Sequence, residues 1–167
     1  MQFSIGVEYA IHCLLYLTDI PAGRPVGIKD LATYQGVSET YLSKVFTKLK
    51  KSGIIKSIPG VNGGYELAKT AENISFWDIV EAIEGTAPLF QCAEIRQKEI
   101  LLDKENLPET YTKCPCLIKI VMTEAEDQMK QYLRQKTLKW LRDQVNNKIP
   151  EEHAKATIEW FNNPKSR

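Results

Sequence analysis

This 167-residue chain contains four cysteines, whose thiols can bind metals, undergo oxidation or pack as apolar side chains. Cys13 lies among apolar residues, Cys92 stands alone, and Cys114 and Cys116 flank a proline. Thiolates are soft ligands for iron–sulfur clusters and zinc. In a reducing compartment such cysteines are buried thiols, metal ligands or redox sensors rather than a disulfide framework. The apolar neighbours of Cys13 predict a buried thiol, which behaves as a small hydrophobic side chain.

A second pair of chemically capable residues occurs near the start of the chain. Glu8 and His12 are four residues apart within a helical apolar pattern, so they share one helix face. A carboxylate and an imidazole on one face can serve as ligands. They can equally be an exposed glutamate and a half-buried histidine.

The lysines point to an anionic partner, although the whole chain has a net charge of only +1. Residues 40–65 contain five lysines and no acidic residue. Positive charge concentrated in one short segment of a neutral protein predicts an anion-facing surface there.

Three helical patterns precede and include this basic segment. They cover residues 3–18, 28–34 and 39–52. Gly36 ends the second pattern, and Ser38 is typical of the residue that caps the start of the third. A short helix, a turn containing glycine and a capped helix form a helix-turn-helix arrangement.

A β-hairpin is predicted directly after the third helix. Residues 54–58 and 65–68 are strand-like, and the segment between them contains three glycines and Asn62. These residues permit the positive φ angles of a hairpin tip. A hairpin in this position is a wing. The predicted fold class is therefore mainly α with a small β-wing: a winged helix-turn-helix domain plus a long dimerisation helix.

The remaining residues divide the chain into four parts. Ser75 opens a predicted helix that ends at Gly85, which completes a DNA-binding domain over residues 1–85. Residues 86–116 lack periodicity and form a predicted cysteine-bearing sensor loop. Residues 117–148 carry one long helical pattern whose apolar face needs a partner, so we expect a homodimer. Residues 149–167 are a predicted C-terminal tail helix.

The third helix and the wing supply the predicted contacts to double-stranded DNA. Side chains near the start of a recognition helix reach base edges, and lysines neutralise phosphates. The predicted DNA-binding residues are Ser38, Thr40, Tyr41, Ser43, Lys44, Lys48, Asn62, Gly63 and Gly64.

Several segments carry a resemblance to a known family. They are Val26-Gly27-Ile28-Lys29-Asp30-Leu31-Ala32, Ser38-Glu39-Thr40-Tyr41-Leu42, Leu49-Lys50-Lys51-Ser52-Gly53, residues 57–68 with Gly63-Gly64-Tyr65, and residues 78–85 ending in Glu84-Gly85. The chain resembles the IscR/NsrR-type winged-helix transcription regulators of the Rrf-two superfamily. The resemblance covers most of residues 1–148.

The resemblance implies a homodimeric regulator, here expected to be a repressor, that senses iron–sulfur status, nitric oxide or redox state. Cys92 and Cys116 stand where the family places its first and last cluster ligands, and the spacing of Cys114 departs from the family pattern. In one branch of the family, an acid and a histidine at the positions of Glu8 and His12 complete the cluster from the partner subunit. We therefore expect an iron–sulfur cluster, [2Fe–2S], drawing on Cys92, Cys114, Cys116, Glu8 and His12.

The wing departs from the family at Pro59, where the family usually carries an arginine. Proline has neither a charge nor a side-chain donor, so we expect the wing to contact only the DNA backbone.

Two other regulatory or binding functions remain open, and an enzyme is not expected. The chain could be a cluster-free thiol-switch regulator, or an interaction module that does not bind DNA. A thiol oxidoreductase would favour Cys-x-x-Cys at a helix start in a βαβ context, which the Cys-Pro-Cys sequence does not match. No apolar run is long enough to span a membrane or resembles a signal peptide, so we expect a cytoplasmic protein.

Overall fold

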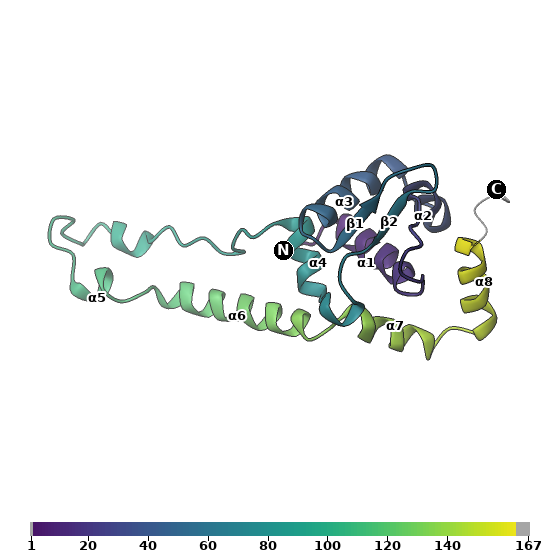
Figure 1. Ribbon diagram of the computed structural model, residues 1–167. Helices are drawn as coiled ribbons and strands as arrows, with labels where there is room; N and C mark the ends of the chain where they lie inside the picture. Colours follow the sequence, from purple (N-terminus) through teal and green to yellow (C-terminus); the bar gives the residue numbers. More distant parts are fainter. Residues whose placement is uncertain (1, 163–167) are drawn as a thin grey trace. The chain divides into compact units, whose positions relative to one another are not determined.

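The computed structural model describes residues 2–162 and divides the chain into two compact units. The head comprises residues 2–85 and 133–162, and the sensor unit comprises residues 86–132. Figure 1 shows the order of the elements along the chain. The predicted tail, residues 149–167, lies partly outside the described residues.

Helices α1 (Ile5–Thr18), α2 (Ile28–Gln35), α3 (Glu39–Lys51) and α4 (Phe76–Glu84) build the head. Gly36 ends α2 in the left-handed conformation, with φ 68°, which a residue with a Cβ adopts at a cost. A capping box between Ser75 and Asp78 opens α4, as expected from the sequence. The core between these helices is formed by fully buried side chains: Leu14, Leu31, Leu42, Phe46, Leu49, Ile54, Ile74 and Ile79.

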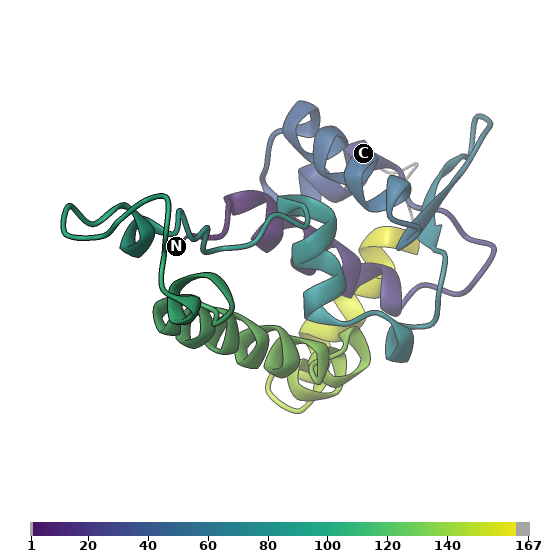
Figure 2. The same cartoon turned by 90° about the vertical axis from the view of Figure 1, so that its left-hand side faces the viewer.

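The wing is an antiparallel hairpin of β1 (Ile55–Ile58) and β2 (Gly64–Leu67). Figure 2 shows it beside α3. The N–H of Val26 donates to the carbonyl of Tyr65 at 3.0 Å, and the N–H of Tyr65 donates back at 2.8 Å. These two bonds anchor β2 to the segment before α2. A 3₁₀ turn, Ala71–Asn73, then leads to α4.

The predicted continuous helix over residues 117–148 is wrong. The structure has α6 (Leu117–Arg134) and α7 (Leu138–Asn146) instead. Thr137 caps α7 by accepting from the N–H of Trp140 at 3.1 Å. The N–H of Leu138 donates to the carbonyl of Ile74 at 2.9 Å, which ties the break to the strand-like residues before α4. Tertiary hydrogen bonds therefore overrule the helical periodicity, and α7 belongs to the head.

Helix α8 (Glu151–Asn162) also packs on the head. Phe161 is buried, and its ring centroid lies 4.9 Å from that of Tyr34 and 5.6 Å from that of Tyr16. The hydroxyl groups of Tyr34 and Thr157 are 2.7 Å apart. The helix predicted in the tail is thus present over Glu151–Asn162, and it contacts Tyr16 of α1 and Tyr34 of α2.

The sensor unit contains the 3₁₀ turn Ile95–Lys98, the short helix α5 (Glu109–Thr112) and most of α6. The N–H of Leu89 donates to Oε2 of Glu126 at 3.0 Å, so the chain after α4 runs beside α6. Glu126 is buried, and Lys130 lies 2.7 Å from its other oxygen. These contacts place the predicted loop of residues 86–116 against α6.

Candidate functional site

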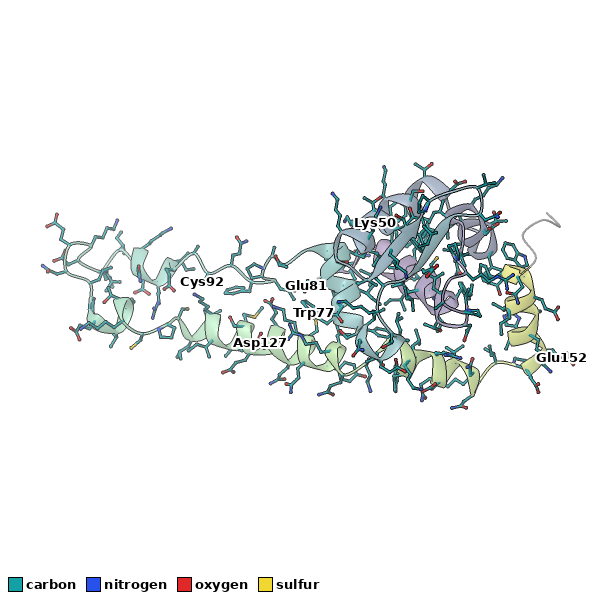
Figure 3. The ribbon with its side chains drawn as sticks, in the orientation of Figure 1. Lys50, Trp77, Glu81, Cys92, Asp127 and Glu152 are labelled. Carbon is teal, nitrogen blue, oxygen red and sulfur yellow. The ribbon has the colours of Figure 1, made fainter. Side chains whose placement is uncertain are left out.

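The recognition helix α3 begins at Ser38, whose hydroxyl accepts from the N–H of Tyr41 at 3.4 Å. Four buried residues fix the inner face of α3: Leu42, Val45, Phe46 and Leu49. The residues opposite them at helical spacing are exposed: Thr40, Lys44, Thr47 and Lys51. We call these four the outward stripe. The outward stripe combines two hydroxyls with two ammonium groups. Figure 3 labels Lys50, which precedes Lys51 on the same helix but is not part of the stripe.

The outward stripe differs from the set of DNA-binding residues predicted from the sequence. It includes Thr47 and Lys51, which are exposed but were not among the predicted contacts. Their spacing from Thr40 and Lys44 would have shown this, because positions 40, 44, 47 and 51 recur on one helix face. Ser43 is half-buried, and its carbonyl accepts from the hydroxyl of Thr47 at 2.8 Å.

Two side chains predicted to contact DNA are engaged within the head. The ring of Tyr41 packs edge-on against that of Tyr9, with centroids 5.6 Å apart. Nζ of Lys48 donates to the carbonyl of Ile83 at 2.6 Å, at the C-terminal end of α4. Tyr41 therefore joins α3 to α1, and Lys48 joins α3 to α4.

The glycines of the wing serve its packing. A Cβ at Gly63 would lie 2.3 Å from the carbonyl oxygen of Ile58, and one at Gly64 would lie 2.4 Å from that of Val26. Both positions thus exclude any side chain. Asn62 and Pro59 are exposed near the hairpin tip. Of the predicted wing contacts, only Asn62 offers a side chain to DNA.

The sensor unit brings together two thiols that are far apart in the sequence. The side chain of Cys92 lies close enough to that of Cys116 to help lower the pKa of the Cys116 thiol. Figure 3 labels Cys92 on the segment between α4 and α5. Sγ of Cys92 also contacts Oε1 of Glu94 at 3.6 Å. Glu94 has φ 48°, an uncommon conformation for a residue with a side chain. We call Cys92 and Cys116 the sensor pair.

The surroundings of Cys116 favour its thiolate. The backbone N–H groups of Lys119 and Ile118 in the first turn of α6 lower the pKa of its thiol below the usual 9.0, and Cys92 and Arg96 lower it further. An N-terminal helix turn stabilises negative charge in this way. Cys116 thus has the environment of a reactive or metal-binding cysteine.

Arg96 ties together the two chain segments that carry the sensor pair. Its Nε donates to Oε2 of Glu94 at 2.9 Å. Its Nη2 donates to the carbonyls of Cys114 at 2.5 Å and Tyr111 at 3.2 Å. The planar guanidinium suits such divergent contacts. Sequence reasoning missed Arg96, because nothing in the spacing shows that residues 94–96 meet residues 111–114.

The other two cysteines lie in contrasting surroundings. Cys114 is exposed, beside the sensor pair in sequence but not joined to it. Cys13 is fully buried in α1, and burial raises the pKa of its thiol to about 12. The prediction that Cys13 is a buried apolar residue is therefore confirmed.

Glu8 and His12 are both exposed on α1. They line an open groove of about 520 Å³ with apolar neighbours that include Phe3, Ile5 and Ile11. They belong to the head, whereas the sensor pair belongs to the other unit. Across residues 2–162, no group of three or more His, Cys, Asp or Glu side chains converges as a metal site.

Comparison with known families decides the class of the protein. The model of the Rrf2 family, described as an iron-dependent transcriptional regulator, matches residues 3–144. The chain belongs to the Rrf2 family. The predicted family resemblance and the predicted winged-helix fold class are therefore confirmed. Members of this family are transcription regulators rather than enzymes, as expected from the sequence.

Curated relatives agree with this assignment. Protein rrf2 of Nitratidesulfovibrio vulgaris is 34% identical over 138 residues, which are 83% of this chain and 85% of the relative. The transcriptional regulator NsrR of Halalkalibacterium halodurans is 32% identical over 139 residues, covering 83% and 88% of the two chains.

Solved structures share the fold. CymR, the global cysteine regulator of B. subtilis, matches with a TM-score of 0.63 and 22% identity over 86% of this chain and 97% of its own. IscR of T. potens matches with a TM-score of 0.63 and 23% identity over 90% and 93%. None of the helices described for this chain has the length and apolar character needed to cross a membrane.

Proposed function

We propose that this Rrf2-family regulator is a homodimeric repressor whose affinity for a double-stranded DNA operator is set at the sensor pair. The observation that carries this proposal is the contact between Cys92 and Cys116, which 23 intervening residues separate in the sequence. A chain segment with few buried side chains holds these two thiols together beside a cationic guanidinium. That arrangement favours redox or metal chemistry over packing.

The sensor pair fits one half of an iron–sulfur site. A [2Fe–2S] cluster takes four protein ligands, and the sensor unit of one chain supplies two adjacent thiols. Cys114 is exposed and stands aside in this proposal. Glu8 and His12 of a second copy supply the remaining two ligands, since both are exposed on α1. When bound, such a cluster supplies one-electron chemistry and sensitivity to oxidants.

The exposed face of α6 supports a dimer. Five large side chains on this helix are 42–77% exposed: Leu117, Ile118, Val121, Met122 and Tyr132. Four of them lie at helical spacing in the first two turns of α6, and Tyr132 lies on the same side near the end of the helix; we call these five the apolar stripe. A cluster of exposed apolar side chains on one helix face marks an interface. A second copy of α6 is the occupant that also places two sensor units in one assembly.

The head carries the proposed DNA contacts. In the major groove, Thr40 and Thr47 face base edges, whereas Lys44 and Lys51 face phosphates. Exposed Asn62 lets the wing contact the adjacent backbone. The predicted contacts Ser38, Tyr41, Ser43 and Lys48 instead position α3.

A cluster-free thiol switch is the second candidate, favoured by the lowered pKa of Cys116. In this version hydrogen peroxide oxidises the sensor pair. The two thiols lose two protons and two electrons and form one disulfide, while the peroxide is reduced to two water molecules. The same pair of residues sets operator affinity in both candidates.

Operator binding before and after peroxide tests the proposed function. The probe is a fluorescent duplex selected by the wild-type protein from a random pool under anaerobic conditions. We expect peroxide to change the dissociation constant at least about tenfold, equivalent to about 1.4 kcal/mol of coupling. Cys92→Ala should abolish the response, and Cys114→Ala should retain it. A response that survives in Cys92→Ala would contradict the proposal.

A further inference from the structure

The end of α4 is a junction where three parts of the head meet just before the chain enters the sensor unit. Lys48 of α3 donates to the carbonyl of Ile83 at 2.6 Å. The N–H of Ser4, which precedes α1, donates to Oε1 of Glu84 at 2.8 Å. Residue 86, two positions later, begins the sensor unit. We call residues 83–85 the junction.

Side chains around the junction are closely packed against α1 and α3. A Cβ added to Gly6 of α1 would lie 3.2 Å from Cγ2 of Ile83 and 3.2 Å from the hydroxyl of Tyr41. Helices α1, α3 and α4 therefore pack tightly at Gly6, where a side chain would require Ile83 and Tyr41 to shift by a few tenths of an ångström. A displacement of Ile83 has little free volume to absorb it.

The backbone conformation of Gly85 sets the direction in which the chain continues after α4. Its φ of 89° and ψ of −173° form a combination that is open almost only to glycine. Its N–H still donates to the carbonyl of Glu81 at 2.9 Å, so the last turn of α4 is closed. The chain thus leaves an intact helix end through one residue with a special backbone conformation.

Lys48 has a charge and a position that sequence reasoning would assign to phosphate binding. Its ammonium instead satisfies a carbonyl in the last turn of α4, where a cation is favoured by the helix dipole. Moving Ile83 would either break this charge-assisted hydrogen bond or pull the C-terminal half of α3. Lys44, one turn earlier, is exposed on the outward stripe; Lys48 is exposed as well, and the hydrogen bond of its ammonium to Ile83 is what distinguishes the two lysines.

We infer that Lys48 is a positioning residue that transmits the state of the sensor unit to the recognition helix through the carbonyl of Ile83. This inference rests on the proposed function, because that function supplies the signal. It assigns the two lysines of α3 different tasks. Lys44 contributes affinity through a phosphate, and Lys48 makes affinity depend on the sensor.

The salt dependence of DNA binding separates the two lysines without any signal. Each variant is titrated against a random-sequence duplex at several salt concentrations, after metal removal with a chelator under reducing conditions. Lys44→Met should reduce the slope of log K against log salt by about 0.9, the value of one lost phosphate contact. Lys48→Met should leave the slope within error of wild type. An equal loss of slope in both variants would overturn the inference.

The peroxide response tests transmission. Operator dissociation constants are measured before and after peroxide for wild type, Lys48→Met, Lys48→Arg and the matched control Lys44→Met. Lys48→Met should reduce the ratio of the two constants at least about threefold. Lys48→Arg keeps a cationic donor and should retain most of the ratio, and Lys44→Met should weaken both states equally. The fully buried Cys13 stays unlabelled by iodoacetamide in a folded head, which checks each variant.

The outcomes distinguish this inference from the proposed function. If peroxide leaves the operator dissociation constant of the wild type unchanged, the proposed function is contradicted. The signal that Lys48 is inferred to transmit would then be absent. A wild-type response that persists unchanged in Lys48→Met would overturn this inference alone. Loss of the response in both Lys48→Met and Lys48→Arg, with Cys13 protected, would also contradict it.

Discussion

The head and the sensor unit are held together in different ways. Among residues 2–162, every buried apolar side chain except Cys116 belongs to the head. The sensor unit relies on polar contacts, chiefly those of Arg96 with Glu94 and Cys114 and that of Glu126 with the N–H of Leu89. Hydrophobic burial supplies most folding free energy, so the head can keep its shape by itself. Binding of a cofactor or a second copy, or formation of a disulfide, would stabilise the sensor unit further.

The contrast teaches how such a regulator can respond without unfolding. Segments that change state are drawn from the less stable parts of a protein. Here the two thiols proposed to respond lie in the weakly buried unit, and α3, the proposed recognition helix, lies in the strongly buried one. Four predictions test this division, in order of decreasing effect.

The thiols of the two units should differ most strongly in reactivity. With a pKa of about 12, Cys13 is a thiolate in about one molecule in ten thousand at pH 8. The thiolate fraction of Cys116 at that pH exceeds about one in ten, because its pKa lies below 9.0. In metal-free, reduced protein, labelling of Cys116 by iodoacetamide should therefore be at least about a thousandfold faster, as followed by peptide mass spectrometry.

The pH dependence supplies the control for this experiment. The labelling rate of Cys116 should reach half of its maximum below pH 9, because its pKa is lowered from the usual 9.0. The rate at Cys13 should still be rising at pH 10. Equal rates at pH 8 would show that the two thiols share one kind of environment.

Core truncation should affect the two units unequally. Phe46 is fully buried in the head, so Phe46→Ala should reduce the free energy of unfolding by about 3–5 kcal/mol. Ile100 is 95% exposed in the sensor unit, so Ile100→Ala should change it by less than about 0.5 kcal/mol. Urea denaturation followed by circular dichroism measures both. Comparable losses would contradict the division into a packed and a weakly packed unit.

An acidic residue in the apolar stripe should dissociate the proposed dimer. Val121→Asp would bury an unpaired charge at the interface and weaken association at least about a hundredfold, the effect of about 3 kcal/mol. Thr123→Asp adds the same charge on the opposite side of α6 and serves as the control. Sedimentation at micromolar concentration should give one chain mass for Val121→Asp and two for wild type. A monomeric wild type would rule out this interface.

Substitutions on α3 should give the smallest of these effects. Thr47→Ala removes a side chain that we propose faces a base edge, so discrimination between the selected operator and its single-base variants should fall about tenfold at one position. Tyr41→Ala removes the contact with Tyr9 and should instead lower stability by about 1 kcal/mol without changing that discrimination. Fluorescence anisotropy with variant duplexes measures discrimination. The opposite pattern would restore Tyr41 as the base-reading residue.

Local signals in the sequence were sufficient to predict the N-terminal part of the head, residues 2–85. Ser38, Gly36, Ser75 and the wing glycines act through caps, turns and close backbone contacts, which depend on neighbouring residues. The helix break at residues 135–137 could not be predicted in this way. The bond from the N–H of Leu138 to Ile74 spans 64 residues, and the periodicity of α6 and α7 shows no interruption.

For the cysteines and for the lysines of α3, the sequence predicted the residue types involved but not which side chains contact one another. The sequence indicated Cys92 and Cys116, but also Cys114, because spacing alone does not tell which thiols face each other. It indicated lysines on α3, but not that the ammonium of Lys48 binds the carbonyl of Ile83. Both distinctions arise from contacts between segments distant in sequence, which periodicity does not encode.

Iron and sulfide analysis of anaerobically purified protein, together with its visible absorption spectrum, tests the central claim most directly. Wild type and Cys114→Ala should both be coloured and contain about two iron and two sulfide ions per site. Cys92→Ala and Cys116→Ala should be colourless and free of iron, since each removes one thiol of the sensor pair. Iron and colour that persist without Cys92 or Cys116, or that vanish with Cys114, would contradict the assignment of the sensor pair as the cluster site.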